Sequence, residues 1–164
     1  MNTDTPHRDD LDPPTAALAA LSAAHRTLSA VIDRELRAAC GLSLAEADVL
    51  ASLARSPDGR QRMVDIAGQM SVSKSGVTQI TDRLVAAGLA ARESCATDRR
   101  LVYAAITTAG RDLLAKGAPV LAAIAREHIA SRLPDADLGK LTKTLRIIAA
   151  TSPPQPSQRR GAET

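Results

Sequence analysis

The chain has 164 residues and contains neither Phe nor Trp, with Tyr103 as its single aromatic residue. A core of this composition is aliphatic, and the shortage of aromatic rings disfavours binding to single-stranded nucleic acid, which depends on base stacking. The net charge of +3, from 21 basic and 18 acidic residues, permits a polyanionic partner without requiring one.

The cysteine content and the N-terminal sequence point to a cellular compartment. Two cysteines form no disulfide framework, which fits a reducing environment. The start of the chain, "MNTDTPHRDDLDPP", is acidic and unlike a signal peptide, and no apolar run is expected to approach membrane-spanning length. The sequence therefore predicts a cytoplasmic protein with one domain, residues 13–150, and no membrane partner.

The N-terminal part predicts a disordered arm, residues 1–12, followed by one long helix. Asp12 is a candidate N-cap, two prolines occupy the first turn, and Gly41 ends the helix after Cys40. Steps of three and four residues place an apolar stripe on this helix: Leu18, Leu21, His25, Leu28, Ile32 and Leu36. A stripe of this length needs a partner of similar length.

Two shorter helices are predicted next. Ser43 and Glu46 form a capping box that starts a helix running to about Leu53. The polar stretch 55–62 predicts a loop, and residues 63–70 then predict a third helix with one apolar face.

The chain then changes from helical to β-compatible sequence. Residues 74–87 predict a fourth helix, capped by Ser73 and ended by Gly88. The segments 89–94 and 101–107 predict two short strands, separated by the polar sequence "CATDRR". The fold class is therefore mainly α with a small two- or three-stranded antiparallel wing.

Helical periodicity returns at Thr108 and continues to about residue 150. Pro119 is expected to kink this region or to mark the start of a helix. Residues 151–164 predict a disordered tail. The last helix carries a heptad-like apolar seam: Leu138, Leu141, Leu145 and Ile148.

The fourth helix has two chemically different faces. On a helical wheel, Val77, Ile80 and Leu84 fall together and form an apolar face. Glutamine can pair with adenine, threonine can meet the thymine methyl group, and arginine or a helix N-terminus can bind phosphate. The residues on the opposite face and in the N-terminal turn are Lys74, Ser75, Thr78, Gln79, Asp82 and Arg83, and most of them carry groups of this kind.

The neighbours of this helix complete a DNA-binding arrangement. A short helix, a turn, a second helix and a basic-tipped strand pair predict a winged helix-turn-helix. Arg99 and Arg100 at the tip are suited to a narrow minor groove, with Asp98 orienting the guanidinium of Arg100. Between Arg60 and Arg100, seven basic residues face four acidic ones, so this segment accounts for the whole net charge.

Three motifs then carry a resemblance to a known family. They are "SKSGVTQITDRLVAAGLAAR", the D-x-R sequence Asp98–Arg100 and the segment "ITTAG". With the order of the helices, the chain resembles the MarR family of bacterial transcription regulators over about residues 13–150. One departure is Cys95, at a wing position where that family often has Asp.

The resemblance implies a homodimeric regulator, with repression as the expected activity, that binds a pseudo-palindromic operator in double-stranded DNA. It assigns residues 43–107 to the DNA-binding lobe and residues 13–40 and 108–150 to dimerisation. The residues implied for dimerisation are Leu18, Leu21, Leu28, Leu138, Leu141, Leu145 and Ile148. Those implied for DNA binding are Ser73, Lys74, Ser75, Thr78, Gln79, Arg83, Asp98, Arg99 and Arg100.

The resemblance also implies a pocket for a small phenolic or other anionic effector, which His25 would line. Two alternatives stay open: a redox-responsive regulator that senses through Cys95, and a winged-helix protein-interaction module without DNA binding. The sequence contains no metal-ligand spacing, phosphate-binding glycine loop or nucleophile motif. We therefore expect no metal, no cofactor and no enzymatic activity.

Overall fold

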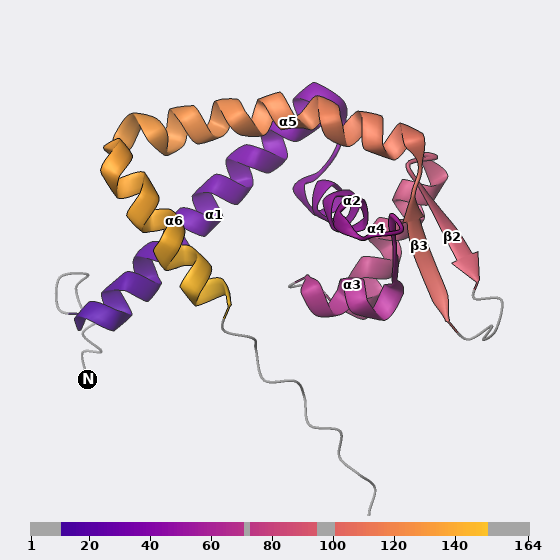
Figure 1. Ribbon diagram of the computed structural model, residues 1–164, viewed down its shortest axis with the longest axis horizontal. Coiled ribbons are helices and arrows are strands. Elements are labelled where there is room, and N and C mark those ends of the chain that lie inside the picture. The colour runs from indigo at the N-terminus through magenta and orange to yellow at the C-terminus, as the bar shows by residue number, and fades with distance from the viewer. Residues whose placement is uncertain (1–10, 71–72, 95–100, 151–164) are drawn as a thin grey trace, which may run out of the picture. The chain divides into compact units, whose positions relative to one another are not determined.

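The computed structural model describes residues 11–70, 73–94 and 101–150, which are mainly helical with one small antiparallel sheet (Figure 1). The chain forms two compact units, Met1–Ile124 and Ala125–Thr164. The elements in chain order are α1 (Pro13–Cys40), α2 (Leu44–Arg55), β1 (Arg60–Arg62), α3 (Met63–Gln69), α4 (Lys74–Ala86), β2 (Ala90–Ser94), β3 (Val102–Ile106), α5 (Thr108–His128), the 3₁₀ helix η2 (Ala130–Arg132) and α6 (Asp135–Ala149).

The predicted boundaries of α1 are confirmed by its capping interactions. The backbone N–H of Thr15 donates to Asp12 Oδ1 at 2.9 Å, which satisfies a free donor of the first turn. At the other end, Gly41 adopts φ = 74°, and its N–H donates to the carbonyl of Arg37. Glycine reaches this left-handed conformation without the cost that a Cβ would add, which explains why the helix ends there.

One expectation about α1 was wrong. The helix is 28 residues long with a mean hydropathy of 1.2 over an 18-residue window, so by length and composition it passes the test for a membrane-spanning helix. Alanine supplies much of this hydropathy, and none of that window is buried, unlike the mostly buried core helices of soluble proteins that meet the same criteria. Leu36, near the C-terminal end of α1, is buried in the core of the first unit. A single helix of this length and composition is weak evidence for a membrane span.

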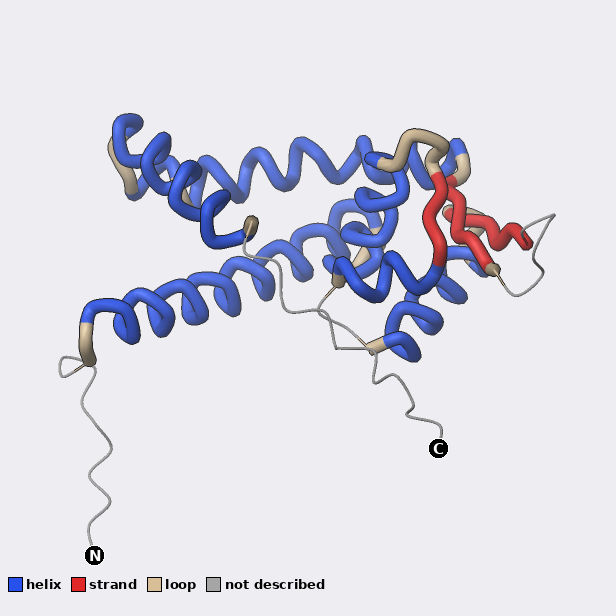
Figure 2. Tube along the Cα trace, turned by 60° about the horizontal axis from the view of Figure 1, so that its bottom comes forward, coloured by secondary structure: helices blue, strands red, loops and turns tan. Residues whose placement is uncertain are grey.

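The three strands, drawn in red in Figure 2, form one sheet. Their order is β1-β3-β2, and both pairings are antiparallel. The predicted hairpin is present, with Ala90 opposite Ile106 and Ser94 opposite Val102. The prediction of a loop throughout residues 55–62 was wrong, because Arg60–Arg62 pair with β3 as an additional strand. This polar segment lacks the alternation that marks a strand in sequence, and β3 supplies the pairing that makes it one.

The core of the first unit is aliphatic, as the composition predicts. It is built mainly from α2, α3 and α4, with the end of α1 and one face of the sheet closing it. Its fully or almost fully buried side chains include Leu36, Val49, Leu50, Leu53, Ile66, Val77, Leu84 and Ala104. This core holds the helices that carry the predicted DNA-binding residues.

Helix α5 runs without interruption through Pro119. Pro119 therefore does not mark the start of a helix, although its missing N–H removes one bond from the helical ladder. The helix begins beside the end of α4: Thr107 Oγ1 donates to the Gly88 carbonyl at 2.8 Å and accepts from the Gly110 N–H at 3.0 Å. The second unit contains η2 and α6, whose residues are half-buried or exposed.

Gly110 allows this close approach, which generates a prediction. A Cβ added at Gly110 would overlap the Leu89 carbonyl oxygen and lie 3.0 Å from Ile106. We therefore expect Gly110→Ala to lower the free energy of unfolding by about 2 kcal/mol through overpacking. Urea denaturation at fixed protein concentration measures this value.

Gly68 in α3 provides the matched control, because nothing lies within 4 Å of a Cβ added there. Gly68→Ala should raise the free energy of unfolding by roughly 0.5–1 kcal/mol through helix propensity. Equal effects of the two substitutions would contradict the packing explanation.

Candidate nucleic-acid interface

Helix α4 has the N-terminal cap that its sequence predicts. Ser73 Oγ accepts from the Gly76 N–H at 3.1 Å and lies 2.9 Å from Ser75 Oγ. Lys74 and Ser75 occupy the exposed first turn. This end of the helix combines free backbone N–H groups, hydroxyls and one cation, which together suit a phosphate group.

The two predicted faces of α4 are present. Val77 and Leu84 are each 1% exposed and Ile80 is 6% exposed, whereas Ser75, Thr78 and Gln79 are exposed. The Thr78 hydroxyl donates to the Lys74 carbonyl at 3.0 Å, so its donor is used within the helix. The methyl group is then the part of Thr78 suited to a thymine methyl contact.

Asp82, on the polar face of α4, pairs with a residue of the sheet. Its carboxylate lies 2.9 Å from Arg92 Nη2 in β2, and both side chains are partly exposed. The pair joins the helix to the strand and offsets a negative charge that would repel DNA phosphates. Arg92 is not predictable as a site residue from the sequence, because pairing between a strand and a helix leaves no spacing signal.

Arg83 of α4 pairs with Glu46 of α2, with 2.8 Å between Nε and Oε1. The Arg83 side chain is 57% exposed and that of Glu46 is 13% exposed. Burial raises the pKa of Glu46, but hydrogen bonds from Arg83 and Ser43 outweigh it and leave the pKa below its usual value. Arg83 is predicted from the family resemblance to contact DNA, and the structure shows a protein partner for it.

The exposed face of the sheet carries two further arginines. Arg60 lies 5.2 Å from the centroid of the Tyr103 ring and 3.3 Å from Glu93. Arg62 pairs with Asp65 at 2.6 Å. Among the cations at positions 60–92, Lys74 is the one without a carboxylate partner in the described part of the chain.

The tip of the wing lies outside the described residues. Asp98, Arg99 and Arg100 therefore stay predictions, as does redox sensing through Cys95. Cys40 is half-buried, and its thiol donates to the Leu36 carbonyl at 3.2 Å. Within the described ranges, no group of three or more His, Cys, Asp or Glu side chains is arranged to hold a metal ion.

A cavity of about 680 Å³ lies within the first unit between α1, α2 and α3. Its lining includes His25, the residue predicted to face an effector, together with Asp33, Asp48 and Arg55. Burial raises the pKa of Asp48, while the charge of Arg55 opposes this shift. The cavity therefore offers one guanidinium to an anion, with carboxylates on the same lining.

Comparison with known proteins places this geometry in a family. A sequence profile of the MarR family matches residues 41–101. The structure is similar to AbsC, a MarR family transcriptional regulator from Streptomyces coelicolor, with 31% identity, a TM-score of 0.72 and coverage of 85% of this chain and 94% of AbsC. The chain belongs to the MarR family.

Two further solved structures extend the comparison. Sco3205, a MarR family transcriptional regulator from Streptomyces coelicolor crystallised with DNA, has 26% identity and a TM-score of 0.74, with 90% of this chain and 91% of Sco3205 covered. BpsR from Bordetella bronchiseptica shares the fold at 22% identity and a TM-score of 0.71, with coverage of 81% and 98%. No curated protein sequence matches. AbsC and Sco3205 are MarR family transcriptional regulators, and the chain has their winged-helix fold.

The anchoring face of α4 generates a second prediction, at Thr81. Thr81 is 0% exposed, and its hydroxyl has no hydrogen-bond partner in the described structure. Thr81→Val keeps the shape and removes the unpaired polar group, so the free energy of unfolding should rise by about 1 kcal/mol. Thr78→Val, at an exposed position of the same helix, should change stability by less. A loss of stability in the Thr81 variant would show that this hydroxyl has a partner in solution.

Proposed function

We propose that this MarR family member binds a specific pseudo-palindromic operator in double-stranded DNA as a homodimer and represses transcription from it. The observation that carries the proposal is α4, which presents an exposed polar face from a helix fixed by a buried apolar face. The match to Sco3205, solved with DNA, supports the same use of the fold. Two recognition helices would enter successive major grooves about 34 Å apart.

The roles of the side chains follow from their chemistry. Gln79 is exposed and suited to a bidentate contact with adenine, while the Thr78 methyl group suits thymine. Lys74, with Ser73 and Ser75, would bind phosphate at the helix N-terminus. Asp98, Arg99 and Arg100 would form the minor-groove contact of the wing, as the family resemblance implies.

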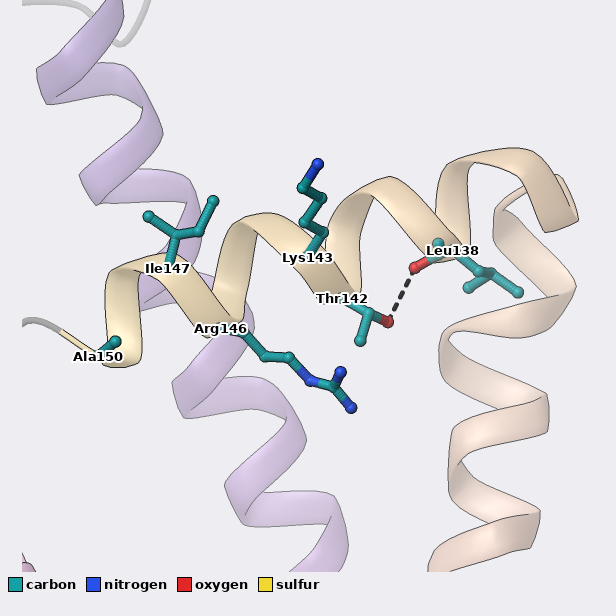
Figure 3. Close-up of a pocket in the computed structure, with 7 residues that line it drawn as sticks. Leu138, Thr142, Lys143, Arg146, Ile147 and Ala150 are labelled. Atoms are coloured by element: carbon teal, nitrogen blue, oxygen red, sulfur yellow. Dashed lines mark hydrogen bonds between the residues drawn. The ribbon is translucent and has the colours of Figure 1, made fainter.

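Homodimer formation is supported by apolar side chains that each unit leaves exposed. In the first unit, Leu18 is 65% exposed, and Leu28 on the same stripe is half-buried. In α6, exposed apolar residues stand beside the polar side chains seen in Figure 3, where Thr142 donates to the Leu138 carbonyl. The exposed set comprises Leu18, Leu21, Leu121, Leu141, Leu145, Ile147 and Ile148. A second copy of the chain would cover such surfaces, which monomeric proteins rarely expose together.

An effector is proposed to bind the cavity beside His25 and to change operator affinity. BpsR is a protein whose DNA binding is regulated by 6-hydroxynicotinic acid. For this chain, the proposal rests on the cavity itself, where Arg55 is the group suited to a phenolate or carboxylate. The carboxylates of Asp33 and Asp48 restrict where such an anion can bind.

The DNA-binding proposal predicts different effects for two exposed residues of α4. Duplexes selected by the wild-type protein from a randomised pool provide the operator probe. Lys74→Ala should weaken binding to all duplexes alike and reduce the salt slope by about 1. Gln79→Ala should relax preference at one base pair, at a cost of about 1–3 kcal/mol. Failure of the wild-type protein to select any common sequence would refute operator binding.

The dimer proposal predicts that a charge in the α6 seam separates the subunits. Leu145→Glu should convert a dimer to a monomer at micromolar concentration, because burying an unpaired carboxylate in an interface is costly. Sedimentation velocity without DNA measures the change. Lys143→Gln changes the net charge by the same amount at a position outside the seam of Leu138, Leu141, Leu145 and Ile148, and it should leave the dimer intact. A Leu145 variant that remains dimeric would exclude this seam from the interface.

A further inference from the structure

The ion pair between Arg83 and Glu46 connects the last turns of the recognition helix α4 to the start of α2. Nε of Arg83 donates to Glu46 Oε1 at 2.8 Å. The two residues are 37 positions apart in sequence, so the contact depends on the tertiary fold. The mostly buried Glu46 carboxylate occupies a fixed place, whereas the Arg83 side chain extends to it across the surface.

The second oxygen of Glu46 is held by the capping box of α2. Oε2 accepts from the Ser43 N–H at 2.9 Å and from the Ser43 hydroxyl at 2.8 Å. Asp33 of α1 binds the next backbone group, accepting from the Leu44 N–H at 2.8 Å. The start of α2 is therefore fixed both by its own cap and by α1, and Glu46 presents its remaining oxygen to α4.

These contacts give Arg83 a role that differs from a phosphate contact. Leu84, the next residue, is buried against the core, so the apolar face fixes how deeply α4 packs. Apolar packing is non-directional, so a small rotation about the contact costs less than withdrawal of the helix from the core. A charged hydrogen bond at the helix surface restrains that rotation, and with it the direction in which Thr78 and Gln79 point.

We infer that Glu46 and Arg83 are positioning residues for operator binding: their ion pair fixes the orientation of the recognition helix on α2. This inference rests on the proposed DNA-binding function and deepens it. The energetic effect of this ion pair comes mainly from Glu46, the less exposed of the two side chains. A pair between two exposed side chains contributes little, but a largely buried carboxylate without its partner is unfavourable.

The decisive variant is Glu46→Gln. A glutamine at this position also completes a capping box, with its carbonyl oxygen toward Ser43, so its NH₂ group faces the Arg83 guanidinium. The variant therefore removes the ion pair and keeps the cap. Removal of a carboxylate from a DNA-binding lobe should by itself favour a polyanion. A loss of operator affinity in this variant would therefore be opposite to the effect expected from its net charge alone.

The expected results use the duplex selected by the wild-type protein, at a temperature well below unfolding. Glu46→Gln should raise the operator Kd by about tenfold, which is within the coupling energies of contacting residues. Arg83→Gln should raise it by a similar factor, and the double variant should be no weaker than either single one. Asp58→Asn, which removes a carboxylate from the exposed turn after α2, should cause no loss.

Two outcomes would overturn the inference. In the first, Glu46→Gln binds as tightly as the wild-type protein. In the second, the effects of the two substitutions add, and Arg83→Gln reduces the salt slope by about 1, as a direct phosphate contact requires. Either outcome leaves operator binding by the wild-type protein intact. If the wild-type protein selects no duplex, operator binding fails, and a thermal-unfolding cycle on the same variants still measures the ion pair.

Discussion

The structure depends on holding one helix by its apolar face while the opposite face stays free for solvent or DNA. In α4, Val77, Ile80 and Leu84 provide that hold, and they pack against a core that contains no aromatic ring. Small aliphatic side chains pack without the large flat surfaces of Phe or Trp, so backbone segments must approach closely to exclude water. Gly110 beside Leu89 is one result of this demand. Within the described ranges the buried hydroxyl of Thr81 has no hydrogen-bond partner, so the same packing tolerates an unsatisfied polar group.

The ion pairs around this helix determine which charged side chains remain available to bind a partner. The arginines at positions 60, 62, 83 and 92 each lie against a carboxylate. Such pairs at the surface contribute modestly to stability, but they cancel much of the positive charge that the sequence places in this segment. Binding to phosphates would therefore depend on Lys74 and on the predicted wing arginines. Of the paired arginines, Arg83 connects α4 to α2, and Arg92 connects the sheet to α4.

The features that could be predicted from the sequence are those set by residues close together in the chain. The caps at Asp12, Ser43 and Ser73 involve residues three positions apart, and the two faces of α4 follow from helical periodicity. The strand β1 and the Glu46–Arg83 pair could not be predicted, because both arise between segments far apart in sequence. The resemblance to the MarR family supplied the function of the lobe, but not the partners of its arginines.

The two units differ in how much of their apolar surface they bury. The first has a continuous buried core, whereas α6 in the second has no buried residue and exposes Leu141, Leu145 and Ile148. An isolated amphipathic helix gains little from propensity and needs packing to be stable. The apolar seam of α6 therefore has a physical reason to associate with another copy. If it does, folding of this part of the chain and pairing of two recognition helices are one event, and protein concentration controls both.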